Sequence, residues 1–291
     1  MVCINRYTYR TKIAISRNTP NFVYMKKTIV TLAAAMLLFV SAAQAQEVNP
    51  IATISQQPGW CTIFHRWGFI GDSMCSGEYE YAREDGSTVW HENYDYSWGQ
   101  RMVAAIGGAV GYNFSQGGET AQGWIANFWD YPVNRNGDIS AKAHPCQAYI
   151  VALGCNDRSG YEPGDARKDI NLEDYTKNAG TFIGYYGGII QRVKSIQPGA
   201  RFFVVTLPTL YGKEEFSAEI RKLPEIFDNV YLIDLEKYGQ DFNDPKLKER
   251  YFEKGHMNAA GYQLMAWTFM TYINWIVDNN IRDFYDICMV K

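Results

Sequence analysis

Two polar residues in this chain stand directly behind apolar segments that are typical of buried β-strands. Ser73 closes the tripeptide Gly71-Asp72-Ser73 after Phe69-Ile70, and Asn156 follows an apolar run at 148–153. Alone, each motif is typical of an ordinary turn. In open α/β sheets, however, ligands bind at the carboxyl ends of the strands, so we expect both residues to lie at one ligand-binding edge. A serine hydroxyl placed there could attack a carbonyl group if a base took its proton.

His256 is the candidate for that base. It ends the segment Glu253-Lys-Gly-His256, late in the chain and after the last predicted strand. A single histidine is by default structural, and the mature chain contains three others, His65, His91 and His144. His256 differs from them because a carboxylate lies three residues away, and a carboxylate can accept the imidazole N–H and orient the ring.

A fourth motif, Asn-Phe-Ser-Gln-Gly-Gly-Glu-Thr at 113–120, is interpreted as a polar, glycine-containing loop between two helical patterns. In this order and spacing the four motifs resemble those of the SGNH (GDSL-like) hydrolase family, named for its Ser, Gly, Asn and His blocks. The resemblance runs from Gly71 to Gly261 and includes His256-Met-Asn-Ala-Ala-Gly-Tyr262. The G-x-S-x-G elbow of another serine-hydrolase fold is not present, because no glycine stands two residues after Ser73.

The resemblance implies a serine ester hydrolase that forms an acyl-serine intermediate, with Ser73 as nucleophile and His256 as base. It also implies an oxyanion hole made by the backbone N–H groups of Ser73 and Gly118 and by the side-chain amide of Asn156. Loss of one such donor typically removes ~2.7 to 4 kcal/mol of transition-state stabilisation. No metal cluster, phosphate-binding loop or nucleotide fingerprint is found, so we expect no cofactor and no metal.

The sequence does not decide which residue orients His256 as the third member of a catalytic triad. The family has aspartate where this chain has Glu253, and glutamate can still accept the imidazole N–H, so Glu253 is favoured. The alternatives are Asp241 or Asp244 upstream, a backbone carbonyl, or no carboxylate at all.

The N-terminal segment predicts export. Residues 25–45 contain Lys26 and Lys27, an apolar run from about residue 29 to residue 40, and Ala43-Gln44-Ala45, as in a secretory signal peptide. The run is shorter than the ~20 residues of a membrane-spanning helix, so we predict a secreted or periplasmic protein without a membrane span in its mature chain. Residues 1–24 are interpreted as an over-extended translation start, with a transit peptide as the alternative.

A single domain of 46–291 remains, and its charge excludes one class of partner. Six of the 28 lysine and arginine residues lie in 1–45, leaving 22 against 31 acidic residues, a net charge of −9. Phosphate binding depends on basic patches, so we expect no nucleic-acid partner. A small-molecule or glycan ester is the expected substrate class.

Elements that could position these residues follow from the apolar pattern. Short apolar segments at 67–70, 148–153, 202–207 and 230–235 predict strands covered on both faces. Between them, residues 172–193 have helical periodicity, and a second helix is predicted after the N-cap candidate Asn258. Such alternation predicts βα units around a parallel sheet. The family resemblance implies a three-layer α/β/α fold with a mostly parallel, flavodoxin-like sheet of about five strands.

The sequence does not decide which ester is the substrate. Export, the acidic charge and two tryptophans shortly after the Gly118 loop, Trp124 and Trp129, suggest an acylated extracellular glycan such as an acetylated polysaccharide. Core positions on a helix are the favoured interpretation of both tryptophans. The alternatives are a lipase for longer acyl chains and a catalytically inactive carbohydrate-binding protein of the same fold, the latter suggested by Glu253 and by an aromatic content of 15%.

Overall fold

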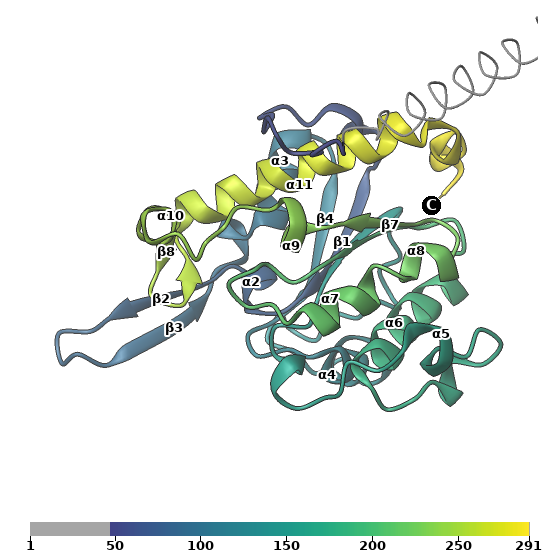
Figure 1. Ribbon diagram of the computed structural model, residues 1–291, viewed down its shortest axis with the longest axis horizontal. Coiled ribbons are helices and arrows are strands. Elements are labelled where there is room, and N and C mark those ends of the chain that lie inside the picture. The colour runs from purple at the N-terminus through teal and green to yellow at the C-terminus, as the bar shows by residue number, and fades with distance from the viewer. Residues whose placement is uncertain (1–46, 291) are drawn as a thin grey trace, which may run out of the picture. The chain divides into compact units, whose positions relative to one another are not determined.

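Five parallel strands form the central sheet of the computed structural model, which describes residues 47–290 (Figure 1). Their order is β4-β1-β5-β6-β7. The strands are β1 (Arg66–Gly71), β4 (Val110–Ser115), β5 (Ala148–Ala152), β6 (Arg201–Val205) and β7 (Val230–Ile233). Among these five the first in the chain lies second in the sheet, which is the flavodoxin-like order. The predicted parallel α/β architecture is confirmed.

Four of the five strands, all except β4, contribute side chains to two hydrophobic cores. In β5, Ala148 and Ile150 belong to one core, whereas Tyr149 and Val151 belong to the other, because successive side chains of a strand point to opposite faces. Helices α3 (Trp98–Ile106) and α11 (Ala259–Asn279) contribute to the first core, and α6 (Phe182–Ile196) and α7 (Glu214–Ile220) to the second (Figure 1). Burial on both faces explains why the strands are continuously apolar.

Strand β4 corrects the interpretation of 113–120 as a loop throughout, because residues 113–115 complete this strand. Its polar end was not recognised as a strand, yet Asn113 and Ser115 are both buried. The Ser115 hydroxyl donates to Asn113 Oδ1, and the Asn136 amide donates to the carbonyls of both residues. Buried polar groups that find such partners are tolerated in a strand.

The two predicted helices differ in outcome. Helix α11 is confirmed with its N-cap, since Asn258 Oδ1 accepts the Gly261 N–H at 3.0 Å. The helix predicted over 172–193 is wrong in its first part, because α6 begins at Phe182 after Thr181, whose hydroxyl caps it. Leu172 is 63% exposed and lies outside the helix. Asparagine, aspartate and threonine side chains compete for backbone groups in this segment and favour turns and caps.

Two short hairpins lie beside the carboxyl edge of the sheet and contribute to the site. One consists of β2 (Glu78–Ala82) and β3 (Thr88–Glu92), follows α2 (Ser73–Ser76) directly and projects from the sheet (Figure 1). The other pairs β8 (Phe252–Glu253) with β9 (His256–Met257). The remaining α-helices are α4 (Ala121–Trp124), α5 (Ala166–Asp169), α8 (Leu223–Ile226), α9 (Leu235–Tyr238) and α10 (Pro245–Tyr251).

All these elements belong to one unit, Asn49–Lys291. The predicted signal peptide at 25–45 and the interpretation of 1–24 lie outside the described residues. Within 47–290, no helix has both the length and the apolar character that crossing a membrane requires.

Candidate active site

Ser73 occupies the first position of α2, at the carboxyl end of β1. Asp72 caps this helix, since its Oδ1 accepts the Met74 N–H at 3.0 Å. The first N–H groups of a helix have no acceptor within it, so the geometry leaves the Ser73 N–H suited to an oxyanion. Tyr262 of α11 fixes the far end of this segment, because its hydroxyl donates to the Glu78 carbonyl.

The loops after β4 and β5 meet at the same edge. The Asn156 side chain donates one amide hydrogen to the Glu119 carbonyl at 2.9 Å, and the Ala121 N–H donates to Asp157 Oδ1 at 2.9 Å. Gly118 is exposed and has φ +77°, a left-handed conformation that glycine adopts without steric cost. Because an amide nitrogen carries two hydrogens, Asn156 keeps one for an incoming group. The oxyanion roles of Gly118 and Asn156 stay predictions.

His256 lies on β9, which packs against α2. Its side chain is 17% exposed, and its Nδ1 is 2.5 Å from Glu80 Oε1, within a hydrogen bond. Glu80 belongs to β2 and its side chain is only 10% exposed. An ionised carboxylate only accepts, so in the neutral imidazole this contact favours the tautomer with its hydrogen on Nδ1 and its lone pair on Nε2.

This geometry differs from the expectation that Glu253 orients the histidine. Glu253 pairs with His256 across the β8–β9 hairpin, but its side chain is exposed, and among residues 47–290 no side-chain hydrogen bond joins the two. The upstream alternatives are also engaged elsewhere: Asp244 caps α10, and Asp241 accepts from the Thr209 hydroxyl at 3.3 Å. Glu253 was favoured because it is close to His256 in sequence. The carboxylate that contacts the imidazole is instead that of Glu80, which lies 176 positions away in the chain.

Because Gly255 has no side chain, Glu80 can reach His256. A Cβ atom built on Gly255 would stand 2.7 Å from Glu80 Oε1, so a side chain at this position would displace the carboxylate. The only sequence signal that could have pointed to Glu80 is the alternation Glu-Tyr-Glu-Tyr at 78–81, which is typical of a half-buried strand. An acidic residue on the buried face of such a strand needs a partner.

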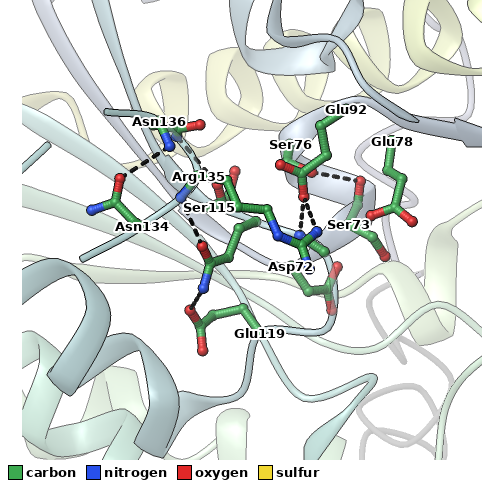
Figure 2. A network of polar contacts seen from close by, with 12 residues as sticks. Asp72, Ser73, Ser76, Glu78, Glu92, Ser115, Glu119, Asn134, Arg135 and Asn136 are labelled. Carbon is green, nitrogen blue, oxygen red and sulfur yellow. Dashed lines mark hydrogen bonds and ion pairs between the residues drawn. The ribbon is translucent and has the colours of Figure 1, made fainter. Parts of the chain in front are cut away.

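Two further glutamates of the hairpin, Glu78 and Glu92, lie near Ser73 (Figure 2). Glu78 Oε1 is 3.9 Å from His256 Nε2, and burial raises the pKa of Glu78, although the nearby His256 opposes this effect. Glu92 accepts the Gly117 N–H and pairs with Arg135 Nη1 at 3.1 Å. Glu92 therefore ties the hairpin to the loop after β4, whereas Glu80 ties it to His256.

Family membership is decided by sequence. The sequence model of the GDSL-like Lipase/Acylhydrolase family matches residues 69–264, from the end of β1 into α11. The chain belongs to this family. It is therefore a hydrolase that acts on ester bonds.

The hydrolase also resembles solved structures. A family two carbohydrate esterase from Cellvibrio japonicus is 19% identical with a TM-score of 0.49, over 74% of this chain and 62% of the other. Est24, a carbohydrate acetylesterase from Sinorhizobium meliloti, is 14% identical with a TM-score of 0.45, over 73% of this chain and 99% of the other. These values assign no substrate to the hydrolase. No curated protein matches it.

The two tryptophans considered as a sugar platform are core residues. Trp124 is fully buried and donates its indole N–H to the Phe114 carbonyl at 2.9 Å, and Trp129 is 6% exposed. The core interpretation of both residues is confirmed, and neither can stack on a ligand in this structure.

Asp72, which caps α2, makes the stability of the hydrolase depend on pH. Burial raises the pKa of Asp72 to about 7, opposed by the Met74 N–H and aided by the charge of Asp157. A carboxyl whose pKa is higher in the folded than in the unfolded chain makes the protein lose stability as pH rises, here from about 4 to about 7.

We therefore expect Asp72→Asn to be more stable than the wild type at pH 8, by on the order of 2 kcal/mol, and to lose this advantage near pH 4. Asparagine caps helices as well as aspartate does, so the cap itself is kept. Urea unfolding of both proteins at pH 4.5 and pH 8 measures the difference. A variant that is less stable than the wild type at pH 8 would contradict the raised pKa of this buried carboxyl.

Proposed function

We propose that this hydrolase cleaves carboxylic esters through an acyl-enzyme on Ser73, with His256 as base and Glu80 as the carboxylate that orients it. The hydrogen bond of 2.5 Å between His256 Nδ1 and the buried Glu80 carboxylate is the observation that carries the proposal. By holding the hydrogen on Nδ1, Glu80 leaves Nε2 free to take the Ser73 proton. Glu80 also stabilises the imidazolium that forms.

In the first half of the reaction, the Ser73 oxygen adds to the ester carbonyl while its proton passes to His256 Nε2. The resulting oxyanion is bound by the Ser73 and Gly118 N–H groups and by the free amide hydrogen of Asn156. Collapse of this intermediate breaks the bond to the alkoxy oxygen, which leaves as the alcohol with the proton from His256. Water then attacks the acyl-serine with the same base, which releases the carboxylic acid and restores Ser73.

We propose that the acyl group of the substrate ester is short. A cavity of about 50 Å³ lies against Met74 and Cys75, the two residues after Ser73, and against Cys155, the residue before Asn156. Its lining is mostly apolar and it is little larger than one or two water molecules, whose share of liquid volume is ~30 Å³ each. Ser73, Asn156 and His256 do not line this cavity, which lies beneath them, and an acyl group that entered it from Ser73 would have to be short.

An acylated glycan outside the cytoplasm is the substrate that we propose, supported by the signal-peptide pattern of residues 25–45. The test is a series of p-nitrophenyl esters from acetate to decanoate beside acetate release from acetylated xylan, with the chain that begins at Gln46. We expect kcat/KM to be highest for acetate, to fall at least tenfold by octanoate, and acetate to be released from xylan. A preference for octanoate or decanoate would contradict both the short acyl group and the glycan.

A further inference from the structure

The β2–β3 hairpin has two faces of different chemistry. Strand register places Glu78 opposite Glu92 and Glu80 opposite Trp90, so these four side chains share one face. On the other face Tyr79 stacks on Tyr81 with ring centroids 6.0 Å apart and contacts His91 edge-on at 5.5 Å. The acidic face, defined as Glu78, Glu80, Trp90 and Glu92, is the one that meets the catalytic residues.

Trp90 lies on this acidic face, opposite Glu80 and two positions from Glu92. Its cross-strand neighbour Glu80 binds His256, and Glu92, two positions along the same strand, binds the Gly117 N–H. Side chains two positions apart in a strand point to the same face. The indole is 60% exposed, so it offers a stacking surface on the face that carries Glu80 and Glu92.

Glu78 offers an unused acceptor on the acidic face. Its side chain is only 9% exposed, and within the described part of the chain no group donates a hydrogen bond to its Oε2. This oxygen is directed at Gly117, since a Cβ built on that residue would stand 2.0 Å from it. A buried acceptor without a partner is costly, and a donor from a ligand would remove that cost. Because this oxygen has almost no accessible surface and packs on Gly117, the Glu78 side chain has to turn from Gly117 to meet the ligand.

We propose that Trp90 and Glu78 form a subsite for the sugar ring that carries the ester, with the ring stacked on the indole and a ring hydroxyl donating to Glu78 Oε2. The inference rests on the proposed function, which it deepens by naming residues that select the alcohol part of the substrate. An indole binds the apolar C–H face of a sugar, and a carboxylate accepts from its hydroxyls.

Charge favours a neutral ring over a cationic group at this subsite. Arg135 Nη1 is 3.1 Å from Glu92 and would stand 2.8 Å from a Cβ built on Gly117, so a guanidinium already lies beside Glu92 and Gly117. A quaternary ammonium ester would fit an aromatic and acidic site of another kind, but here it would meet this positive charge. A neutral polyhydroxylated ring uses both the stacking surface and the unpaired acceptor.

The experiment compares acetylated xylo-oligosaccharide with p-nitrophenyl acetate, whose alcohol part has no ring hydroxyls. In Trp90→Ala and in Glu78→Leu the ratio of the two kcat/KM values should fall at least tenfold, and Trp90→Phe should restore most of the loss. Tyr81→Ala is the matched control, since Tyr81 is 44% exposed on the opposite face of the same hairpin, and its ratio should stay within twofold of the wild type.

Binding without an ester bond separates the subsite from the proposed function. Titration calorimetry of Ser73→Ala with xylohexaose, cellohexaose and chitohexaose should give a Kd for at least one of them, and adding Trp90→Ala should raise that Kd at least tenfold. Absence of hydrolysis with a Trp90-dependent Kd would reject the proposed function and keep the subsite. The subsite is overturned if none of the three binds, if Trp90→Ala alters neither the ratio nor Kd, or if acetylcholine outranks the sugar ester.

Discussion

Replacement of Ser73 by alanine is expected to lower kcat for p-nitrophenyl acetate by about 10³- to 10⁶-fold, because no other group can form the acyl-enzyme. The residual rate would come from the oxyanion donors and from binding alone, which still act when the nucleophile is lost. Stopped-flow release of p-nitrophenol measures the loss, and the initial burst of an accumulating acyl-enzyme should vanish together with turnover.

Ser76→Ala is the matched control for this loss. Ser76 lies on the same short helix, and its hydroxyl donates only to the Ser73 carbonyl, at 3.3 Å. We expect kcat to stay within about threefold of the wild type, because removal of one such local hydrogen bond has a net effect of about 1 kcal/mol. Urea unfolding of both variants reports whether either lost its fold. Equal losses of kcat in two folded variants would contradict a specific role for Ser73.

The second large effect is expected at Glu80. Glu80→Gln should lower kcat by about 10²- to 10⁴-fold while KM stays within threefold, because an amide N–H facing Nδ1 favours the tautomer whose Nε2 is protonated. A histidine in that state cannot take the Ser73 proton. Substrate binding does not need the proton transfer, so the loss should appear in kcat and not in KM.

Glu253→Gln makes the same chemical change at the carboxylate that sequence favoured. Its side chain is exposed and has no hydrogen bond to His256, so we expect kcat within threefold of the wild type. Glu80→Asp should recover part of the activity lost in Glu80→Gln, since it restores a carboxylate on a side chain one methylene shorter. If Glu253→Gln loses activity and Glu80→Gln keeps it, the orienting carboxylate has been misassigned.

Much of the fold could be predicted because the strands of a doubly covered sheet have a distinctive pattern. The strands around Phe69, Ile150, Phe203 and Leu232 could be recognised from their continuous apolar sequence, because both faces of each strand are buried. Strand β4 could not be predicted because its end carries polar side chains, and the Asn136 amide that binds the carbonyls of Asn113 and Ser115 lies more than twenty positions away. The start of α6 at Phe182 is set by the Thr181 cap, and hydrophobic periodicity contains no information about such a cap.

The candidate site could be predicted only where function resides in a local motif. Ser73, Asn156 and His256 stand at ends of elements, so their neighbours in sequence indicate their place at the sheet edge. Glu80 and Trp90 instead belong to a hairpin inserted between α2 and α3, and only the tertiary position of that hairpin brings them to the site. Strand alternation indicates which side chains share a face but not what that face meets.

The central claim is that Ser73 is the nucleophile activated by His256, and labelling with a fluorophosphonate followed by peptide mass mapping tests it most directly. One phosphonyl group per chain on the peptide that contains Ser73, with labelling lost in Ser73→Ala and slowed at least a hundredfold in His256→Ala, is the predicted result. A chain that hydrolyses p-nitrophenyl acetate but takes the label at another residue, or takes none, would contradict it.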